Sequence, residues 1–165
     1  MTGSRLRLWT AGTTLILSLI GYPFLAAAQK TTVPQSVLVS SPDKAAIKNQ
    51  LQMAARLARK ALAGFEAAPR DESIPIDEDV RQAARNTYAL IRAARHGLEL
   101  LIVSQKFPDP VDQLNFKKLD DAFNMSRYPV DKESWAVPRE EYLMHSTSEL
   151  RRAIRMVDQV LVLMP

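Results

Sequence analysis

Apolar residues recur at alternating steps of three and four along three long stretches of the chain, and no other feature restricts the fold as strongly. The first series is Ile47, Leu51, Ala54, Ala58, Ala61 and Phe65. The second is Val80, Ala84, Thr87, Ile91, Ala94, Leu98 and Leu101, and the third is Leu143, Thr147, Leu150, Ile154, Val157, Leu161 and Met164. Since an α-helix completes a turn in 3.6 residues, each series lies on one helix face. The spacing therefore predicts three long amphipathic helices.

Proline and acidic residues mark where the predicted helices begin. Ser41-Pro42 places a capping hydroxyl before a proline at the first helical position, and Asp109-Pro110 repeats this order before a shorter helix that ends near Asn124. The acidic run 77–79 opens the second long helix, because negative charge is favoured at a helix N-terminus. Pro138 opens the last helix. Since no useful stretch alternates with period two, we predict an all-α protein, an antiparallel four-helix bundle of three long helices and one shorter one.

The size of the core side chains predicts how these helices approach one another. Alanine fills many positions of the first two series, which favours a close approach of those two backbones. Larger side chains of the last helix would pack opposite them, together with Leu119 and Phe123 of the shorter helix.

The first 28 residues have the order of a secretory signal peptide. Arg5 and Arg7 precede an apolar stretch, Leu8–Leu25, and small residues before Gln29 give the A-x-A pattern of a cleavage site. We expect cleavage before Gln29 and export by the general secretory route, because no twin-arginine pair is present. The alternative is an uncleaved membrane anchor, since a stretch of 18 residues is near the minimum for spanning a bilayer.

These features divide the chain into a signal peptide (1–28), a flexible arm (29–41) and a helical bundle domain (42–165). The protein is therefore expected in the periplasm or another extracytoplasmic lumen. It has no Cys, which excludes disulfides, zinc fingers, iron–sulfur ligation and a cysteine nucleophile. Loss of the signal peptide removes two arginines and leaves 20 basic and 18 acidic residues, a net charge of +2. So small a charge, together with export, argues against nucleic acid as a partner.

The sequence contains no recognisable catalytic or cofactor-binding motif. It lacks a glycine-rich phosphate loop, G-x-S-x-G and H-E-x-x-H, and the acidic stretch 71–79 lacks the order of an EF-hand. A periplasmic haem or metal bundle is the alternative, because helical bundles house such groups in their cores. However, His96 and His145 are predicted to face outward, away from the apolar series of their helices. We therefore predict no enzyme activity, no cofactor and no metal site, and keep a surface haem or metal site as the alternative.

Arginine forms the most informative charged pattern. Residues spaced by four and three form one stripe beside the apolar face of the second helix, which we call the arginine stripe: Arg81, Arg85, Tyr88, Arg92 and Arg95. Arg151 and Arg155 add positive charge on the last helix. Because guanidinium groups in a row suit carboxylates, phosphates or sulfates, we predict docking to an acidic protein or an anionic membrane surface. The alternative is that these arginines pair with acids of neighbouring helices, such as Asp158 or those of the third helix.

The segment 125–137 is the second candidate contact surface. It carries Tyr128 and Trp135, and aromatic residues of this kind are enriched at binding hot spots. The alternative is that Trp135 folds back and holds the segment against the bundle, because a lone Trp in a small domain is usually largely buried.

The helix order resembles PsbQ, the family of accessory subunits on the lumenal face of photosystem II. The shared layout is a long first helix, a long second, a short third and a last helix with an apolar tail before Pro165. The resemblance implies an accessory subunit on the lumenal or periplasmic face of a membrane complex, although the chain lacks the lipobox Cys of the lipidated bacterial members. Taken with the missing catalytic groups, the arginine stripe predicts an exported, non-enzymatic accessory or assembly protein. Thr87 and Thr147 within the apolar series are compatible with either a monomer or an oligomer.

If the signal peptide is cleaved as expected, the exported protein begins at Gln29. Mass spectrometry of the intact protein and of its N-terminal peptide measures this directly. A mass equal to that of the 165-residue chain would instead identify an uncleaved anchor.

Overall fold

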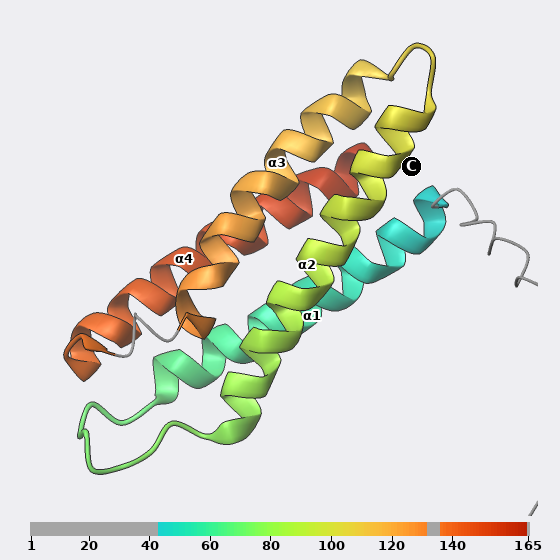
Figure 1. Ribbon diagram of the computed structural model, residues 1–165. Coiled ribbons are helices and arrows are strands. Elements are labelled where there is room, and N and C mark those ends of the chain that lie inside the picture. Colours follow the sequence, from blue (N-terminus) through green and yellow to red (C-terminus); the bar gives the residue numbers. More distant parts are fainter. Residues whose placement is uncertain (1–42, 132–135, 165) are drawn as a thin grey trace, which may run out of the picture. The chain divides into compact units, whose positions relative to one another are not determined.

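Four helices packed against each other make up the described part of the chain, residues 43–131 and 136–164 of a computed structural model (Figure 1). They are α1 (Lys44–Ala67), α2 (Glu78–Ser104), α3 (Pro110–Arg127) and α4 (Arg139–Leu163). A short 3-10 helix, η1 (Tyr128–Val130), follows α3 directly. The described residues contain no strand, so the predicted all-α fold is confirmed. The expected signal peptide and flexible arm lie outside the described residues.

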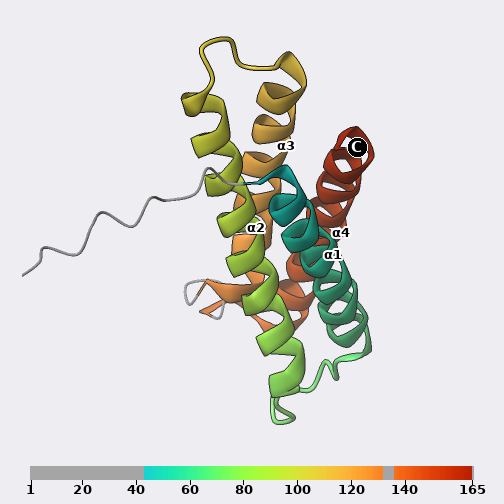
Figure 2. The same ribbon diagram turned by 90° about the vertical axis from the view of Figure 1, so that its right-hand side faces the viewer.

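Each helix packs against two others. α1 contacts α2 and α4, and α3 contacts the same two helices. Figures 1 and 2 show that the α2–α3 connection, the start of α1 and the end of α4 lie at one end of the unit, here called the α2–α3 end. The α1–α2 connection and the start of α4 lie at the other, the α1–α2 end. The two ends therefore expose different segments.

Aspartate side chains cap the first three helices. Asp43, Asp77 and Asp109 each accept a hydrogen bond from the backbone N–H two residues later, at 3.0, 2.8 and 2.9 Å. Asp109 is the cap that the sequence predicted, and Asp77 belongs to the acidic run that was expected at the start of the second long helix. The prediction that Ser41 caps the first helix is wrong, because Asp43 is the cap and α1 begins two residues later than predicted. The reason is that Asp43 is still extended and its carboxylate satisfies a backbone donor of the first turn.

α3 ends at Arg127, three residues beyond its expected end at Asn124. The start of the predicted loop 125–137 is therefore helical. Within this last turn the Ser126 hydroxyl donates to the Phe123 carbonyl at 2.9 Å. The α-helix stops only where Pro129 has no N–H to donate, and the chain tightens there into η1.

The core consists of two apolar clusters, one toward each end. The cluster toward the α2–α3 end includes Ile47, Leu51, Ile91, Leu98, Leu119, Val157 and Val160. The cluster toward the α1–α2 end includes Ala61, Phe65, Val80, Ala84, Tyr142, Leu143 and Leu150. Between them along α2 lies the buried Thr87, whose hydroxyl donates to the Ala83 carbonyl at 2.8 Å. All six residues of the first predicted series are buried, whereas Phe123 of α3 is only half-buried.

α4 buries five of the seven residues of its predicted series, and the other two, Thr147 and Leu161, are only half-buried. Ser146 is buried where Thr147 was expected, and Val160 is buried where Leu161 was expected. Thr147 is half-buried and donates its hydroxyl to the Met144 carbonyl at 2.9 Å. Because α4 packs against both α1 and α3, it buries a strip broader than one series of residues.

α1 and α2 lie in close contact where Gly64 faces Val80. A Cβ atom added at Gly64 would lie 2.2 Å from Cγ2 of Val80 and 2.8 Å from Cγ1. Carbon atoms do not pack at such distances, and the branched Val80 side chain is stiff, so the contact requires glycine. The predicted close approach of the first two helices is confirmed at this position.

Gly64→Ala is therefore expected to lower the free energy of unfolding. The overpacking cost of about 1–3 kcal/mol outweighs the gain of about 1 kcal/mol that alanine brings to a helix. Chemical denaturation measures the change, with Gly97→Ala at a half-buried position of α2 as the control that should gain stability. Equal stabilisation by both substitutions would contradict the close approach.

Candidate functional site

The C-terminal half of the arginine stripe lies against α3. Nε of Arg95 donates to Oδ1 of Asp120 at 2.6 Å, and Nη1 lies 3.8 Å from Glu99. The same guanidinium lies 5.0 Å from the ring centroid of Phe116 and 5.8 Å from that of Phe123. Arg95 therefore joins α3 to α2 by an ion pair and by cation–π contacts. For this residue, the alternative of pairing with an acid of the third helix is the one observed.

Three further residues of the stripe also have internal contacts. The Tyr88 ring stacks on Phe123 at a centroid distance of 5.0 Å. Arg85 pairs with Glu78 and donates to Gln82 at 3.0 Å, both within α2. Arg81 is half-buried and lines a cavity at the α1–α2 end. The stripe is thus partly used to hold the fold.

Arg92 differs from its neighbours in the stripe. It is exposed, and no group within residues 43–131 and 136–164 hydrogen-bonds or ion-pairs with its guanidinium. Beside it the surface is hollowed by a depression of about 490 Å³, which Tyr88, Arg95 and His96 also line. The part of the stripe that is open to a partner is therefore centred on Arg92.

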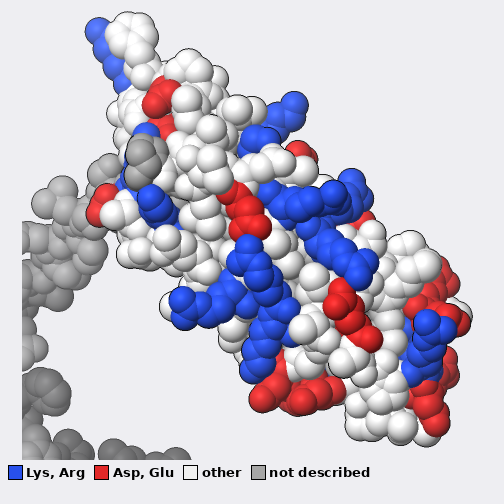
Figure 3. Space-filling view, turned by 180° about the vertical axis from the view of Figure 1, so that it is seen from behind, with Lys and Arg blue, Asp and Glu red and all other residues white. Residues whose placement is uncertain are grey.

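The arginines of α4 lie apart from the stripe, because α2 and α4 are not packing neighbours. Nη2 of Arg151 donates to Glu66 of α1 at 2.6 Å. Asp158 pairs with Arg59 of α1 at 2.8 Å, not with the stripe. Arg155 is exposed and has no partner in the described part of the chain. On the face seen in Figure 3, basic and acidic side chains alternate and do not form one basic surface.

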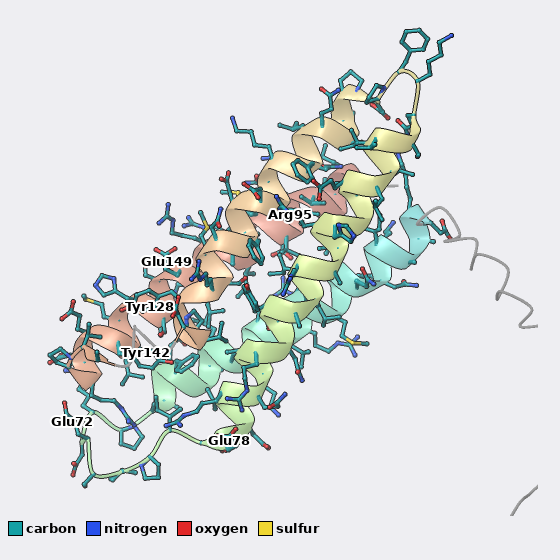
Figure 4. The ribbon with its side chains drawn as sticks, in the orientation of Figure 1. Glu72, Glu78, Arg95, Tyr128, Tyr142 and Glu149 are labelled. Carbon is teal, nitrogen blue, oxygen red and sulfur yellow. The ribbon has the colours of Figure 1, made fainter. Side chains whose placement is uncertain are left out.

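Tyr128 belongs to an aromatic cluster at the α1–α2 end. Its ring centroid lies 6.3 Å from that of Tyr142 and 5.5 Å from that of His145, and Figure 4 shows the two tyrosines close together. The Tyr142 hydroxyl donates to the Pro129 carbonyl at 2.8 Å. Burial raises the pKa of Tyr128 above its ordinary value of 10.0. Tyr128 thus packs η1 onto α4, whereas Trp135 lies outside the described residues.

A cavity of about 260 Å³ at the α1–α2 end was not singled out by the sequence. Glu72, Arg81 and Arg139 line it, from the α1–α2 connection, α2 and α4. The Arg139 guanidinium donates to the carbonyls of Pro69 at 3.2 Å and Ile74 at 2.9 Å, so it holds the connection in place. No spacing rule could have grouped these residues, because each comes from a different segment.

Both imidazoles lie outside the core, as their positions on the helices predicted. His96 is 66% exposed with Nδ1 3.6 Å from Glu99, and His145 is 45% exposed with Nε2 3.8 Å from Glu141. In residues 43–131 and 136–164, no three His, Asp or Glu side chains are placed to hold a metal ion together. None of the described helices combines the length and apolar character needed to cross a bilayer.

Comparison with known proteins identifies no relative. No protein-family model, curated protein or solved structure matches the chain. The resemblance to PsbQ therefore rests on the order and length of the helices, and the function is argued from the residues themselves.

Arg95 and Arg92 should respond differently to truncation. Arg95→Ala is expected to lower the free energy of unfolding by about 1–2 kcal/mol, because it removes a partly exposed ion pair and the contacts with two rings. Arg92→Ala should change it by less than about 0.5 kcal/mol, since the side chain is exposed and has no partner in the described part of the chain. Chemical denaturation of the two variants measures the difference. Equal effects would show that Arg95 does not join α3 to α2.

Proposed function

We propose that the chain is an exported, non-enzymatic accessory or assembly protein that docks an acidic partner protein at Arg92. The observation that carries this proposal is the exposed Arg92 guanidinium, which has no partner in the described part and lies beside a depression lined by Tyr88 and His96. Its donors remain available for a carboxylate, which guanidinium binds in two-point geometry. Arg95, already paired with Asp120, forms the wall of the site and contributes less free charge.

The scaffold that we propose for this site is an antiparallel four-helix bundle. Two observations support that arrangement. α1 and α3 both contact α2 and α4, whereas α1 does not contact α3 and α2 does not contact α4. The connections also place the start of each helix beside the end of the preceding one (Figure 1). Such a scaffold presents the α2 surface rigidly, which favours recognition of a preformed partner.

The surroundings of the two imidazoles and of Arg139 support a non-enzymatic role. The imidazoles of His96 and His145 are exposed. A ring nitrogen of each lies near one carboxylate oxygen, at 3.6 Å for His96 and 3.8 Å for His145. Arg139, which lines the 260 Å³ cavity, already donates to backbone carbonyls. Neither imidazole therefore has the close, oriented carboxylate partner that is typical of a catalytic base, which supports the proposal of a non-enzymatic role.

A PsbQ-like subunit on the lumenal or periplasmic face of a membrane complex is the more specific alternative. The helix lengths of 24, 27, 18 and 25 residues favour it, because they reproduce the layout on which the resemblance rests. The haem- or metal-binding alternative has no comparable observation in its favour.

A photo-crosslinking amino acid at Ala89, which lines the depression beside Arg92, tests the docking site. In the native cell envelope it is expected to form one discrete adduct with an acidic protein. Arg92→Glu should lower the adduct yield at least about tenfold, equivalent to about 1.4 kcal/mol of binding energy. Raising the salt from about 50 to about 500 mM should lower it further, because the Debye length shortens.

Arg155→Glu is the matched control. It makes the same charge change at an exposed arginine of α4 that has no partner among the described residues and lies away from the stripe, and it should leave the adduct yield unchanged. An equal loss in both variants would assign the effect to net charge, and an undiminished adduct with Arg92→Glu would remove the site.

A further inference from the structure

Large apolar side chains are exposed mainly at the α2–α3 end. Ten such side chains are exposed among the described residues, and seven lie at this end: Leu100, Val103, Phe107, Val111, Leu114, Val162 and Leu163. Val103, Phe107 and Val162 are 78%, 83% and 84% exposed. Side chains of the α2–α3 connection stand away from the ribbon in Figure 4. We call these seven residues the apolar tip.

The apolar tip is not an unfilled part of the core. Directly beneath it Met164 is buried in the core cluster with Val160, so the interior is already closed. Leu114 and Val162 line a groove of about 490 Å³ between α3 and α4, which continues the tip along the surface. Apolar side chains gathered in this way on a water-soluble surface mark a contact site.

A basic side chain lies beside the most projecting ring of the apolar tip. Lys106 lies with Nζ 5.7 Å from the ring centroid of Phe107 at the outermost connection. The neighbouring acids are engaged, since Asp109 caps α3 and the buried Asp112 pairs with Lys44 at 2.8 Å. A projecting aromatic ring beside a lysine is typical of the bilayer interface, where the ring enters the acyl boundary and the ammonium group meets phosphates.

If the apolar stretch Leu8–Leu25 is retained as an anchor, the chain is attached to the membrane through the α2–α3 end. α1 begins at the α2–α3 end, where Lys44 bonds to Asp112 of α3. The apolar stretch Leu8–Leu25 is separated from Lys44 by 18 residues, which reach at most about 65 Å when extended. Whenever that stretch is inserted in a membrane, the α2–α3 end is the end attached to it.

We propose that the apolar tip is a lipid-docking surface, on which Phe107, Val103 and Val162 enter the interface of an anionic bilayer while Lys106 contacts lipid phosphates. This surface is separate from Arg92 and goes beyond the proposed function. Its most exposed side chains project outward from a narrow connection and a helix end. A fluid bilayer accommodates projecting side chains directly, whereas a second copy of the chain would have to seat them in the groove between α3 and α4.

A fluorescent label at the tip tests the proposal. Because the chain has no Cys, Val103→Cys accepts an environment-sensitive dye at one position. The exported protein, in whichever N-terminal form mass spectrometry finds, is titrated with vesicles of phosphatidylcholine and phosphatidylglycerol. We expect a blue shift of the dye at Val103, and a weaker one with phosphatidylcholine alone. The control label, Met144→Cys, lies on an exposed side chain near the start of α4 and should show no shift.

A double variant tests which side chains insert. In the Val103-labelled protein, Phe107→Asp with Val162→Asp should raise the lipid concentration at half-maximal shift at least about tenfold, since two apolar side chains no longer enter the interface. Met53→Asp with Met144→Asp is the matched control with the same charge change, and Arg92→Glu separates this surface from the proposed docking site. Both should leave the titration unchanged. All replaced residues are exposed, so thermal unfolding should also be unchanged.

Three results would overturn the proposal. The first is the absence of a shift at Val103 with anionic vesicles, and the second is an equal shift at Met144. The third is a shift that grows with protein concentration when no vesicles are present, which would assign the apolar tip to self-association.

Discussion

The close contact between α1 and α2 is the interaction on which the arrangement of the other helices depends. Small residues on α1, such as Gly64 against Val80, allow the two backbones to approach. Larger side chains of α3 and α4, such as Leu119 and Leu150, then complete the core from the other side. With one flank of α2 covered by α1, the flank that carries the arginine stripe lies toward α3, as the contacts of Tyr88 and Arg95 show.

The arginine stripe illustrates how one sequence pattern acquires several roles. Its residues share a helix face, but α3 covers that face only in part. Arg95 meets Asp120 and two aromatic rings of α3, whereas Arg85 is paired within its own helix. Arg92 lies at the outer edge of the same face and keeps its donors free of internal partners in the described part. The difference comes from the position of the neighbouring helix and not from the chemistry of the side chains.

Two surfaces of different character follow from this arrangement. The first is polar and centred on Arg92, and the second is the apolar tip that begins with Leu100 and Val103. Both lie on α2, and the 11 residues from Arg92 to Val103 span about 16 Å at 1.5 Å per residue. An accessory protein with such surfaces could hold an acidic partner while its tip rests on a bilayer. The rigid helix would then set the distance between the two contacts.

The sequence by itself determined the helices, their approximate starts and most of their buried faces, because these depend on residues within a few turns of one another. Asp77, Asp109 and the first apolar series lie where the pattern placed them. Only the tertiary structure decided that Ser146 and not Thr147 enters the core, and that Arg92 is the arginine of the stripe without a partner in the described part of the chain. It also assembled the apolar tip from α2, α3 and α4. Periodicity defines one apolar face per helix. Whether the side chains beside that face are buried depends on neighbouring helices, which are distant in sequence.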